Sequence, residues 1–150
     1  MDSQQTYQVG QQFIDALHTL EQGAVEDAEQ NVGALVALYS GDARIINAAL
    51  KLAGEERTGT DGAKDFWIEY RRTFGEAYSD FFQVTSNEES AGLFWTTKGT
   101  GKDGQPMEYD GVSLLVFNDE GKINLFRGYY DTRELSRSVG VETQPTRGRE

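Results

Sequence analysis

Apolar residues recur every three or four positions in the first half of the chain, which is the spacing of a helix that buries one face. A first helix is predicted by a stripe that consists of Val9, Phe13, Leu17 and Leu20. The same spacing between residues 26 and 39 predicts a second helix, which ends near Ser40-Gly41. A third helix is expected from Thr60, its N-terminal cap, and carries the aromatic residues Phe66, Trp67, Tyr70 and Phe74.

Apolar runs separated by turn residues follow, as expected for strands. Four long extended segments are predicted at 78–86, 91–100, 105–117 and 123–131. The last two form a hairpin, because Gly121 in the connecting turn can adopt a positive φ at no steric cost, and a helix start follows before Leu135. Earlier in the chain, a short strand at 42–47 and an extended piece at 56–58 flank a loop at 48–56.

Helices first and strands afterwards indicate an α+β fold, with three N-terminal helices packed on one face of a curved antiparallel sheet. A chain of 150 residues, 37% of them hydrophobic, suits one domain, which is predicted to span residues 1–138. Residues 139–150 contain only two sizeable apolar side chains, so they are expected to form a flexible tail.

The charge of the chain restricts its partners. It carries 14 basic and 25 acidic residues, which gives a formal net charge of −11. This charge repels polyanions, so neither nucleic acid nor an anionic membrane is an expected partner. No apolar run approaches the roughly 20 residues that span a bilayer, and the N-terminus lacks the features of a signal peptide. The protein is therefore expected to be soluble and cytoplasmic.

Metal and thiol chemistry find little support in the composition. The chain contains no Cys and a single histidine, His18, at the edge of the first helical stripe. With one His and no cluster of inward-facing carboxylates, no metal site and no cofactor are predicted. A partly exposed structural role is expected for His18.

A family resemblance lies in three stretches: LVALYSGDARI, ERTGTDGAKDFW and VFNDEGKINLFRGYYDTREL. They resemble the helix-then-strand passage, the entry to the third helix and the closing hairpin of the nuclear transport factor 2-like superfamily, also called SnoaL-like or cystatin-like. The resemblance spans about residues 9–139 and implies an α+β cone with an internal cavity. Ketosteroid isomerases and limonene-epoxide hydrolases belong to this superfamily, whose single fold hosts many functions.

The catalytic groups of these relatives are mostly replaced. In ketosteroid isomerases a Tyr and a protonated Asp hold an oxyanion while a second Asp moves the proton. The resemblance places three other residues there: Phe13, Ser113 and Asn47. Limonene-epoxide hydrolases use an Asp-Arg-Asp set assisted by a Tyr and an Asn. Only the Asn is kept, as Asn47, and the other positions hold Lys98 for the Arg, Thr100 and Gly128 for the Asp residues, and Ile45 for the Tyr. Neither reaction is expected by these mechanisms, because the acids are missing.

Side chains along a strand alternate between the two faces of a sheet, and the resemblance sets the phase. The expected inner face consists of Phe94, Thr96, Lys98, Thr100, Tyr109, Gly111, Ser113, Leu115, Phe117, Phe126, Gly128 and Tyr130. The expected outer face is apolar and consists of Leu93, Trp95, Val112, Leu114, Val116, Leu125 and Tyr129. An apolar face of this size indicates a partner, so a twofold homodimer is predicted, with Arg127 and Asp131 at the rim.

The inner face predicts a pocket for a small, partly apolar ligand, kept open where Gly111 and Gly128 withdraw side chains. The expected ligand-binding residues are Asn47, Trp67, Phe94, Thr100, Ser113 and Phe126. For catalysis, Tyr109 or Tyr130 is expected to donate a proton, and Lys98 to pair with an anionic ligand group. Such a site suits an isomerase, cyclase or dehydratase that acts on a carbonyl compound.

Two alternatives stay open. Lys98 can instead extend to the rim of the cone, and the inner aromatic residues can simply fill the interior. The chain is then a non-catalytic, dimeric binding or interaction module. A carboxylate from Glu55 or Glu56 at the mouth of the cone favours catalysis, whereas a cavity packed shut by aromatic side chains favours the module.

Overall fold

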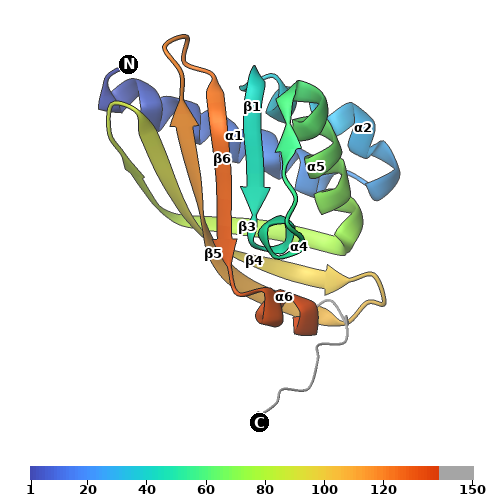
Figure 1. The fold of residues 1–150 in the computed structure, drawn as a ribbon. Coiled ribbons are helices and arrows are strands. Elements are labelled where there is room, and N and C mark those ends of the chain that lie inside the picture. Colours follow the sequence, from blue (N-terminus) through green and yellow to red (C-terminus); the bar gives the residue numbers. More distant parts are fainter. Residues whose placement is uncertain (139–150) are drawn as a thin grey trace.

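A computed structural model describes residues 1–138 and shows an open, six-stranded mixed sheet with helices on its concave face (Figure 1). The strands are β1 (Tyr39–Asn47), β2 (Arg57–Thr58), β3 (Phe74–Ser86), β4 (Ser90–Gly101), β5 (Pro106–Phe117) and β6 (Ile123–Tyr130). The helices are α1 (Ser3–Gln22), α2 (Ala28–Asn31), α3 (Gly33–Val36), α4 (Ala48–Ala53), α5 (Gly59–Thr73) and α6 (Thr132–Ser138), with a 3₁₀ turn at Val25–Asp27. The α+β prediction is confirmed. The tail predicted at 139–150 lies outside the described residues.

The sheet has the order β2-β1-β6-β5-β4-β3. The predicted meander from β3 to β6 is confirmed, with antiparallel pairing throughout. The sheet, predicted as antiparallel, contains one parallel pair, because β1 runs parallel to β6. These two strands are separated in the sequence by two helices and four strands, so no tight turn forces them into opposite directions.

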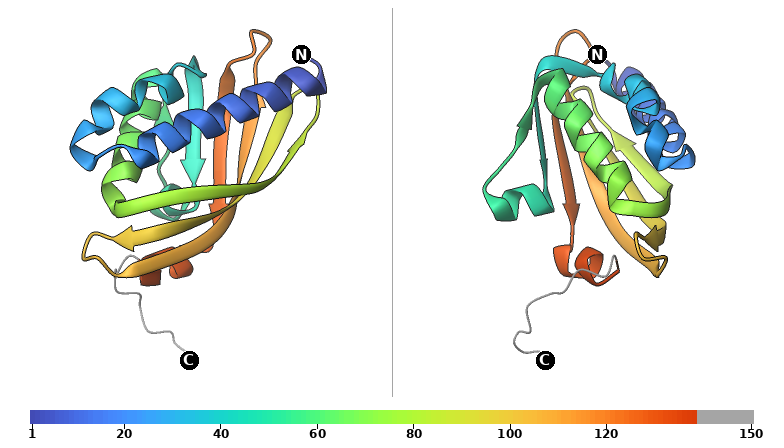
Figure 2. Two further views of the ribbon diagram at one scale, coloured as in Figure 1. Left: turned by 180° about the vertical axis from the view of Figure 1, so that it is seen from behind. Right: turned by 90° about the vertical axis from the view of Figure 1, so that its right-hand side faces the viewer.

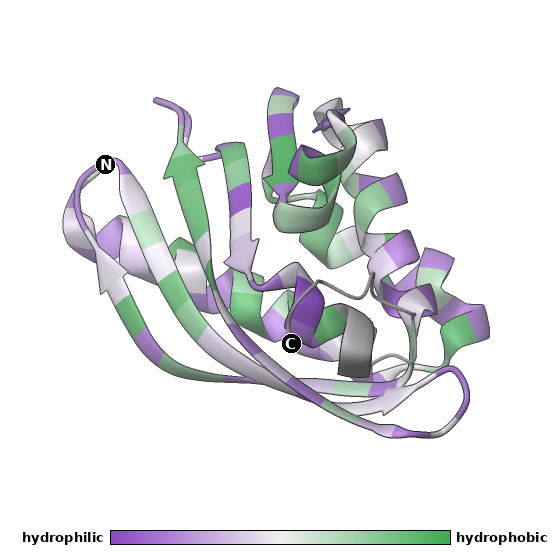
Figure 3. Ribbon diagram, turned by 60° about the horizontal axis from the view of Figure 1, so that its bottom comes forward, coloured by the Kyte–Doolittle hydropathy of each residue, from purple (hydrophilic) through white to green (hydrophobic). Residues whose placement is uncertain are grey.

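Two helices cover the concave face (Figure 2). The longer helix, α1, packs on β3 and β4, and α5 packs on β1 and β2. The N-terminus of α1 is fixed by a capping box, in which Asp2 accepts a hydrogen bond from the Gln5 backbone N–H and the Gln5 side chain accepts one from that of Asp2. The core beneath these helices is apolar, and hydropathy alternates along the strands (Figure 3). No helix within residues 1–138 is long and apolar enough to cross a membrane.

Several helix boundaries differ from the predictions. The helix expected over 26–39 is divided into the 3₁₀ turn, α2 and α3, and the strand β1 already begins at Tyr39. Val32 lies between α2 and α3, and Gly33 begins α3; both residue types form helices less readily than Ala. The loop expected at 48–56 contains α4, which Asn47 caps by accepting a hydrogen bond from the Leu50 backbone N–H at 2.8 Å.

The third helix also begins and ends earlier than predicted. Thr58, rather than Thr60, occupies the N-cap position of α5. Phe74 does not belong to the helix, because α5 ends at Thr73 and β3 begins at Phe74. The short strand at 57–58 and the helix before Leu135, in contrast, lie where the sequence predicts them.

The face predicted for β4 is wrong by one residue. Thr97 pairs with Tyr109, and Leu93 pairs with Ser113. Directly opposed residues share a face of the sheet, and Tyr109 and Ser113 point inward as predicted, so the inner residues of β4 are Leu93, Trp95 and Thr97. Phe94, Thr96 and Lys98 therefore belong to the convex face, because a shift of one residue exchanges the two faces of a strand. The inward predictions for Phe126 and Gly128 on β6 are confirmed.

Candidate functional site

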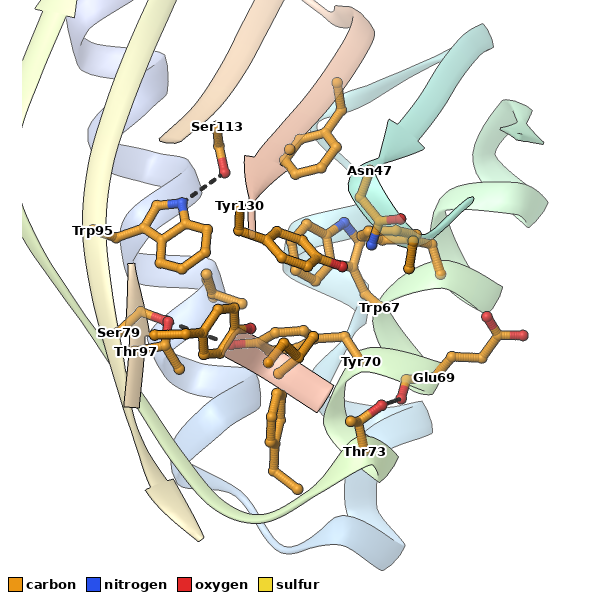
Figure 4. A pocket seen from close by; sticks show the side chains of 18 of the residues that line it. Asn47, Trp67, Glu69, Tyr70, Thr73, Ser79, Trp95, Thr97, Ser113 and Tyr130 are labelled. Atoms are coloured by element: carbon orange, nitrogen blue, oxygen red, sulfur yellow. Dashed lines mark hydrogen bonds between the residues drawn. The ribbon is translucent and has the colours of Figure 1, made fainter. Parts of the chain in front are cut away.

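A cavity of about 340 Å³ lies between the concave face of the sheet, α5 and the start of α4 (Figure 4). This volume falls in the range of pockets that bind small molecules. Six residues predicted for the site line it: Asn47, Trp67, Tyr109, Ser113, Phe126 and Tyr130. They come from β1, α5, β5 and β6, so the fold brings together residues that are far apart in the sequence.

Three residues predicted for the site do not line the cavity. The side chain of Lys98 is 69% exposed on the convex face, and its Nζ lies 3.9 Å from Glu108 Oε1. Phe94 shares that face, and Thr100 Oγ1 accepts a hydrogen bond from the Glu76 backbone N–H at 2.9 Å. The inward orientation predicted for Lys98 and Phe94 is therefore wrong, because the phase of β4 is reversed. No residue described as lining the cavity is a Lys, Arg or His.

Aromatic rings form most of the cavity wall. Trp67 packs edge-on against Phe126, with ring centroids 5.3 Å apart. On the strands, Tyr109 packs edge-on against Trp95 at 5.2 Å and against Tyr130 at 5.5 Å. The Trp indoles are anchored at their polar ends, because Trp67 Nε1 donates to Tyr39 Oη and Trp95 Nε1 donates to Ser113 Oγ, each at 3.0 Å. The wall is thus rigid and offers wide apolar surfaces to a ligand.

The two glycines expected to open the pocket differ in their surroundings. A Cβ at Gly111 would lie 2.5 Å from two ring carbons of Trp95, so the space left by Gly111 is filled by that indole. Gly128 lines the cavity, and a Cβ there would meet only ordinary contacts with Asn47 and Phe126, at 3.4 Å or more. Gly111 therefore positions a wall residue, whereas Gly128 leaves open volume.

Hydrogen-bond donors lie at the end of the cavity formed by Asn47 and Tyr130, whose side chains point toward one another (Figure 4). The Asn47 Oδ1 atom is occupied as the cap of α4, which leaves its amide hydrogens for the cavity. The backbone N–H of Ala49 donates to the Tyr130 hydroxyl, which keeps its own proton. Burial raises the pKa of Tyr130, so this hydroxyl stays protonated at neutral pH.

The opposite end holds a buried polar network that the sequence did not reveal. Glu21, near the end of α1, accepts hydrogen bonds from Tyr70 Oη at 2.7 Å and from Ser79 Oγ at 2.6 Å. The Ser79 backbone N–H also donates to it, at 2.9 Å, and Ser79 Oγ lies 2.6 Å from Thr97 Oγ1. Tyr70, Ser79 and Thr97 line the cavity. The available signal was spacing, because Glu21 follows Leu17 by four residues and continues the buried stripe.

The buried tyrosines of the wall are neutral. Burial raises the pKa of Tyr109 and of Tyr70. Electrostatic repulsion by the neighbouring Tyr130 and Glu21 raises the pKa of Tyr109 further, because it opposes a negative charge on the Tyr109 oxygen. Nearby Tyr109 and Glu21 act in the same direction on Tyr70. At neutral pH these hydroxyls therefore act as hydrogen-bond partners and not as phenolate bases.

Other candidate groups lie away from the cavity. Glu55 and Glu56 form ion pairs with Arg57 and Arg44, at 3.2 and 3.0 Å, and neither lines the cavity. His18 is half-buried, contacts the Ser79 carbonyl oxygen through Nε2 at 2.8 Å and stacks on the ring of Tyr78. In the part of the chain that the structure describes, no cluster of His, Cys, Asp or Glu could hold a metal ion.

Solved structures with the same fold come from several bacteria. An NTF2-like protein of unknown function from Burkholderia pseudomallei K96243 is 17% identical, covers 90% of this chain and 97% of its own, and gives a TM-score of 0.72. An NTF2-like protein from Burkholderia xenovorans LB400 is 17% identical, covers 93% of this chain and 98% of its own, and gives a TM-score of 0.67. A third, of unknown function, from Exiguobacterium sp. 255-15 is 20% identical, with 81% and 96% coverage and a TM-score of 0.64.

These structural neighbours support the NTF2-like cone fold. At such low sequence identity they support nothing beyond the fold. No curated protein sequence matches the chain. The family model described as the SnoaL-like domain matches residues 11–126, which is most of the chain and includes the second half of α1, all of α5 and the sheet through Phe126. The chain therefore belongs to the SnoaL-like domain family.

Proposed function

We propose that this protein binds a small, partly apolar ligand in the cavity of the cone. The observation that carries the proposal is the cavity itself, about 340 Å³ in volume, with mainly aromatic walls and a smaller number of polar side chains. Concave apolar sites with a few convergent polar groups are the usual form of small-molecule sites. The aromatic walls supply affinity by burying apolar ligand surface, and the polar groups orient the ligand.

The end formed by Asn47 and Tyr130 suits a carbonyl oxygen. Both side chains keep hydrogens to donate, and hydrogen bonds to a carbonyl oxygen stabilise the negative charge that develops there during enolisation. This favours an isomerase, cyclase or dehydratase on a carbonyl compound, with Tyr130 as the proton or hydrogen-bond donor. Tyr109, whose ring lies 5.5 Å from that of Tyr130, is the second candidate donor. Lys98 takes no part in this proposal, because it lies outside the cavity.

Binding of adamantanone, a compact ketone, tests this assignment by isothermal titration calorimetry. The wild-type protein is expected to bind it, and Tyr130→Phe to bind it about 2- to 10-fold more weakly, the effect of one neutral hydrogen bond. Tyr129→Phe is the matched control, because Tyr129 is the adjacent residue and is 45% exposed on the convex face. Equal losses in the two variants, or none in Tyr130→Phe, would contradict the assignment.

The second candidate is a non-catalytic binding or interaction module that acts as a homodimer. The observation that favours a dimer is the convex face, where five half-buried apolar side chains lie together: Phe94, Val112, Leu114, Val116 and Leu125. Leu93 and Trp95, predicted for this face, are instead buried on the concave side. Tyr129 continues the apolar surface, with the Arg127 guanidinium 5.3 Å from its ring centroid. We assign this face to a second copy of the chain, which would cover it around a twofold axis.

A further inference from the structure

Glu21 is a buried carboxylate that the carbonyl-binding end of the cavity does not use. It is 3% exposed and lies in the last turn of α1, where the partial negative charge of the helix end disfavours an anion. The last turn contains no basic residue, and among residues 1–135 no Lys or Arg forms an ion pair with Glu21. A carboxylate in such a place needs hydrogen-bond donors, and it has three.

The three donors fix the direction of every hydroxyl in the network. Glu21 accepts a hydrogen bond from the hydroxyl of Tyr70 and from that of Ser79, so the single hydroxyl proton of each points at the carboxylate. With its proton used, Ser79 Oγ can only accept from Thr97, which lies 2.6 Å away. The protons of Tyr70 and Thr97 are thus both used within the network, so the oxygen of each can only accept a hydrogen bond from a ligand.

We infer that Glu21 makes this end of the cavity a receptor for a hydrogen-bond donor, so that the natural ligand carries a hydroxyl or a protonated amine there. The donor would bind to the oxygens of Tyr70 and Thr97, against a wall of aromatic faces that also attract a cation. A ketone or carboxylate oxygen at this end would face lone pairs and be rejected. The inference rests on the proposed function and deepens it, because the two ends of the cavity then select opposite groups: an acceptor at Asn47 and Tyr130, a donor at Tyr70 and Thr97.

Two probes on one scaffold separate the ends. Adamantylamine, protonated at neutral pH, offers only donors, and adamantanone offers only an acceptor. Glu21→Gln keeps the shape of the side chain but replaces one carboxylate oxygen by an amide group that donates hydrogen bonds. The hydroxyls of Tyr70 and Ser79 then no longer both donate to residue 21. We expect this variant to bind the ammonium probe at least about 10-fold more weakly and the ketone within about twofold of wild type. Tyr130→Phe is expected to show the reverse pattern.

Thr97→Val provides a second test that retains Glu21 and nearly the same shape. It removes one acceptor oxygen, and weaker binding of the ammonium probe with unchanged ketone binding is expected. Circular dichroism of each variant establishes that it is folded. Failure of both probes to bind the wild-type protein contradicts the proposed function and this inference together. Binding of the ketone without the ammonium probe, or equal losses of both probes in Glu21→Gln or Thr97→Val, overturns this inference alone.

Discussion

Ser79 binds both carboxylate oxygens of Glu21, through its backbone N–H at 2.9 Å and its hydroxyl at 2.6 Å. Glu21 belongs to α1 and Ser79 to β3, so this pair joins the main helix of the concave face to the sheet. Tyr70 adds α5 through its own bond to Glu21. One buried carboxylate therefore connects α1, α5 and β3 at one end of the cavity. It contributes both to the position of these elements and to the hydrogen-bonding character of the cavity wall.

Replacement of Ser79 by Ala is expected to destabilise the fold. It removes one of the bonds to Glu21 and leaves Thr97 Oγ1 without its partner, and a buried polar group left unpaired costs about 1–3 kcal/mol. Urea unfolding followed by circular dichroism measures this loss. Ser86→Ala on the same strand is the control, because its hydroxyl bonds to the Ser3 carbonyl oxygen in an exposed place, and a change within about 0.5 kcal/mol is expected. Equal effects of the two substitutions would show that the Glu21 network does not stabilise the fold.

Stability is expected to fall in alkaline solution because of the buried tyrosines. Burial raises the pKa of Tyr39, Tyr70, Tyr109 and Tyr130 above the ordinary value of 10.0. Above pH 10 the unfolded chain loses these protons while the folded chain keeps them. These four groups therefore do not change the free energy of unfolding below pH 10, and they decrease it above pH 10.

Absorbance at the tyrosinate band measures this effect during an alkaline titration. Four of the seven tyrosines are expected to ionise late, together with unfolding. Tyr109→Phe should remove one of these late equivalents. Titration of all seven in a single step, while the circular dichroism spectrum stays native, would contradict the burial described for the cavity wall.

Substitution of Gly111 by Ala is expected to disturb the cavity wall. The added Cβ would lie 2.5 Å from the Trp95 ring and from the Tyr129 carbonyl oxygen, so the indole must move, and overpacking of this kind costs about 1–3 kcal/mol. Thermal unfolding and the fluorescence of the two tryptophans report both consequences. Gly41→Ala, on β1, meets nothing within 4 Å of the new Cβ and should leave both unchanged. A native spectrum and unchanged stability in Gly111→Ala would refute the role of Gly111 in seating Trp95.

Introduction of a charge on the convex face is expected to separate the proposed dimer. Light scattering at micromolar concentration should give twice the 16.7 kDa mass of one chain for the wild type, and a single-chain mass for Phe94→Glu, since the residues opposite Phe94 on the neighbouring strands, Val112 and Gln83, carry no charge. A buried, unpaired carboxylate at the interface would cost several kcal/mol, which explains the expected dissociation. Leu52→Glu is the matched control, because Leu52 is 77% exposed on α4. A wild-type mass of one chain would rule out the dimer.

The closing hairpin was predicted from the turn with Gly121, because a short turn fixes the register of two adjacent strands. The phase taken from the family resemblance gave the inner residues of β5 and β6 correctly. It did not predict the face of β4, since strand alternation allows two phases and only the pairing of Thr97 with Tyr109 decides between them. Gly111 carried a usable signal for the phase of β4. A glycine leaves room on its face of the sheet for a bulky side chain of the neighbouring strand, and Trp95 lies opposite Gly111. The wrong phase placed Lys98 and Phe94 in the predicted cavity, whereas both lie on the convex face.

The Glu21 network was missed for another reason. An acidic residue at the end of a helix normally faces water, and the one signal to the contrary is that Glu21 follows Leu17 by four residues on the buried stripe. Its partners Tyr70 and Ser79 lie 49 and 58 residues away and reach it only after α5 and β3 have packed against α1. The aromatic part of the site followed from helix and strand periodicity, whereas its polar part depends on tertiary contacts.

The most direct measurement of ligand binding in the cavity is a nuclear magnetic resonance titration of the two indole N–H signals with adamantanol. The chain contains two tryptophans, Trp67 and Trp95, and both line the cavity. Adamantanol carries both a donor and an acceptor, so it suits either end. Binding in the cavity predicts that both indole signals shift and saturate with one dissociation constant, while the amide of exposed Leu52 stays in place. Indole signals that do not move up to the solubility limit of the probe would contradict the proposed function.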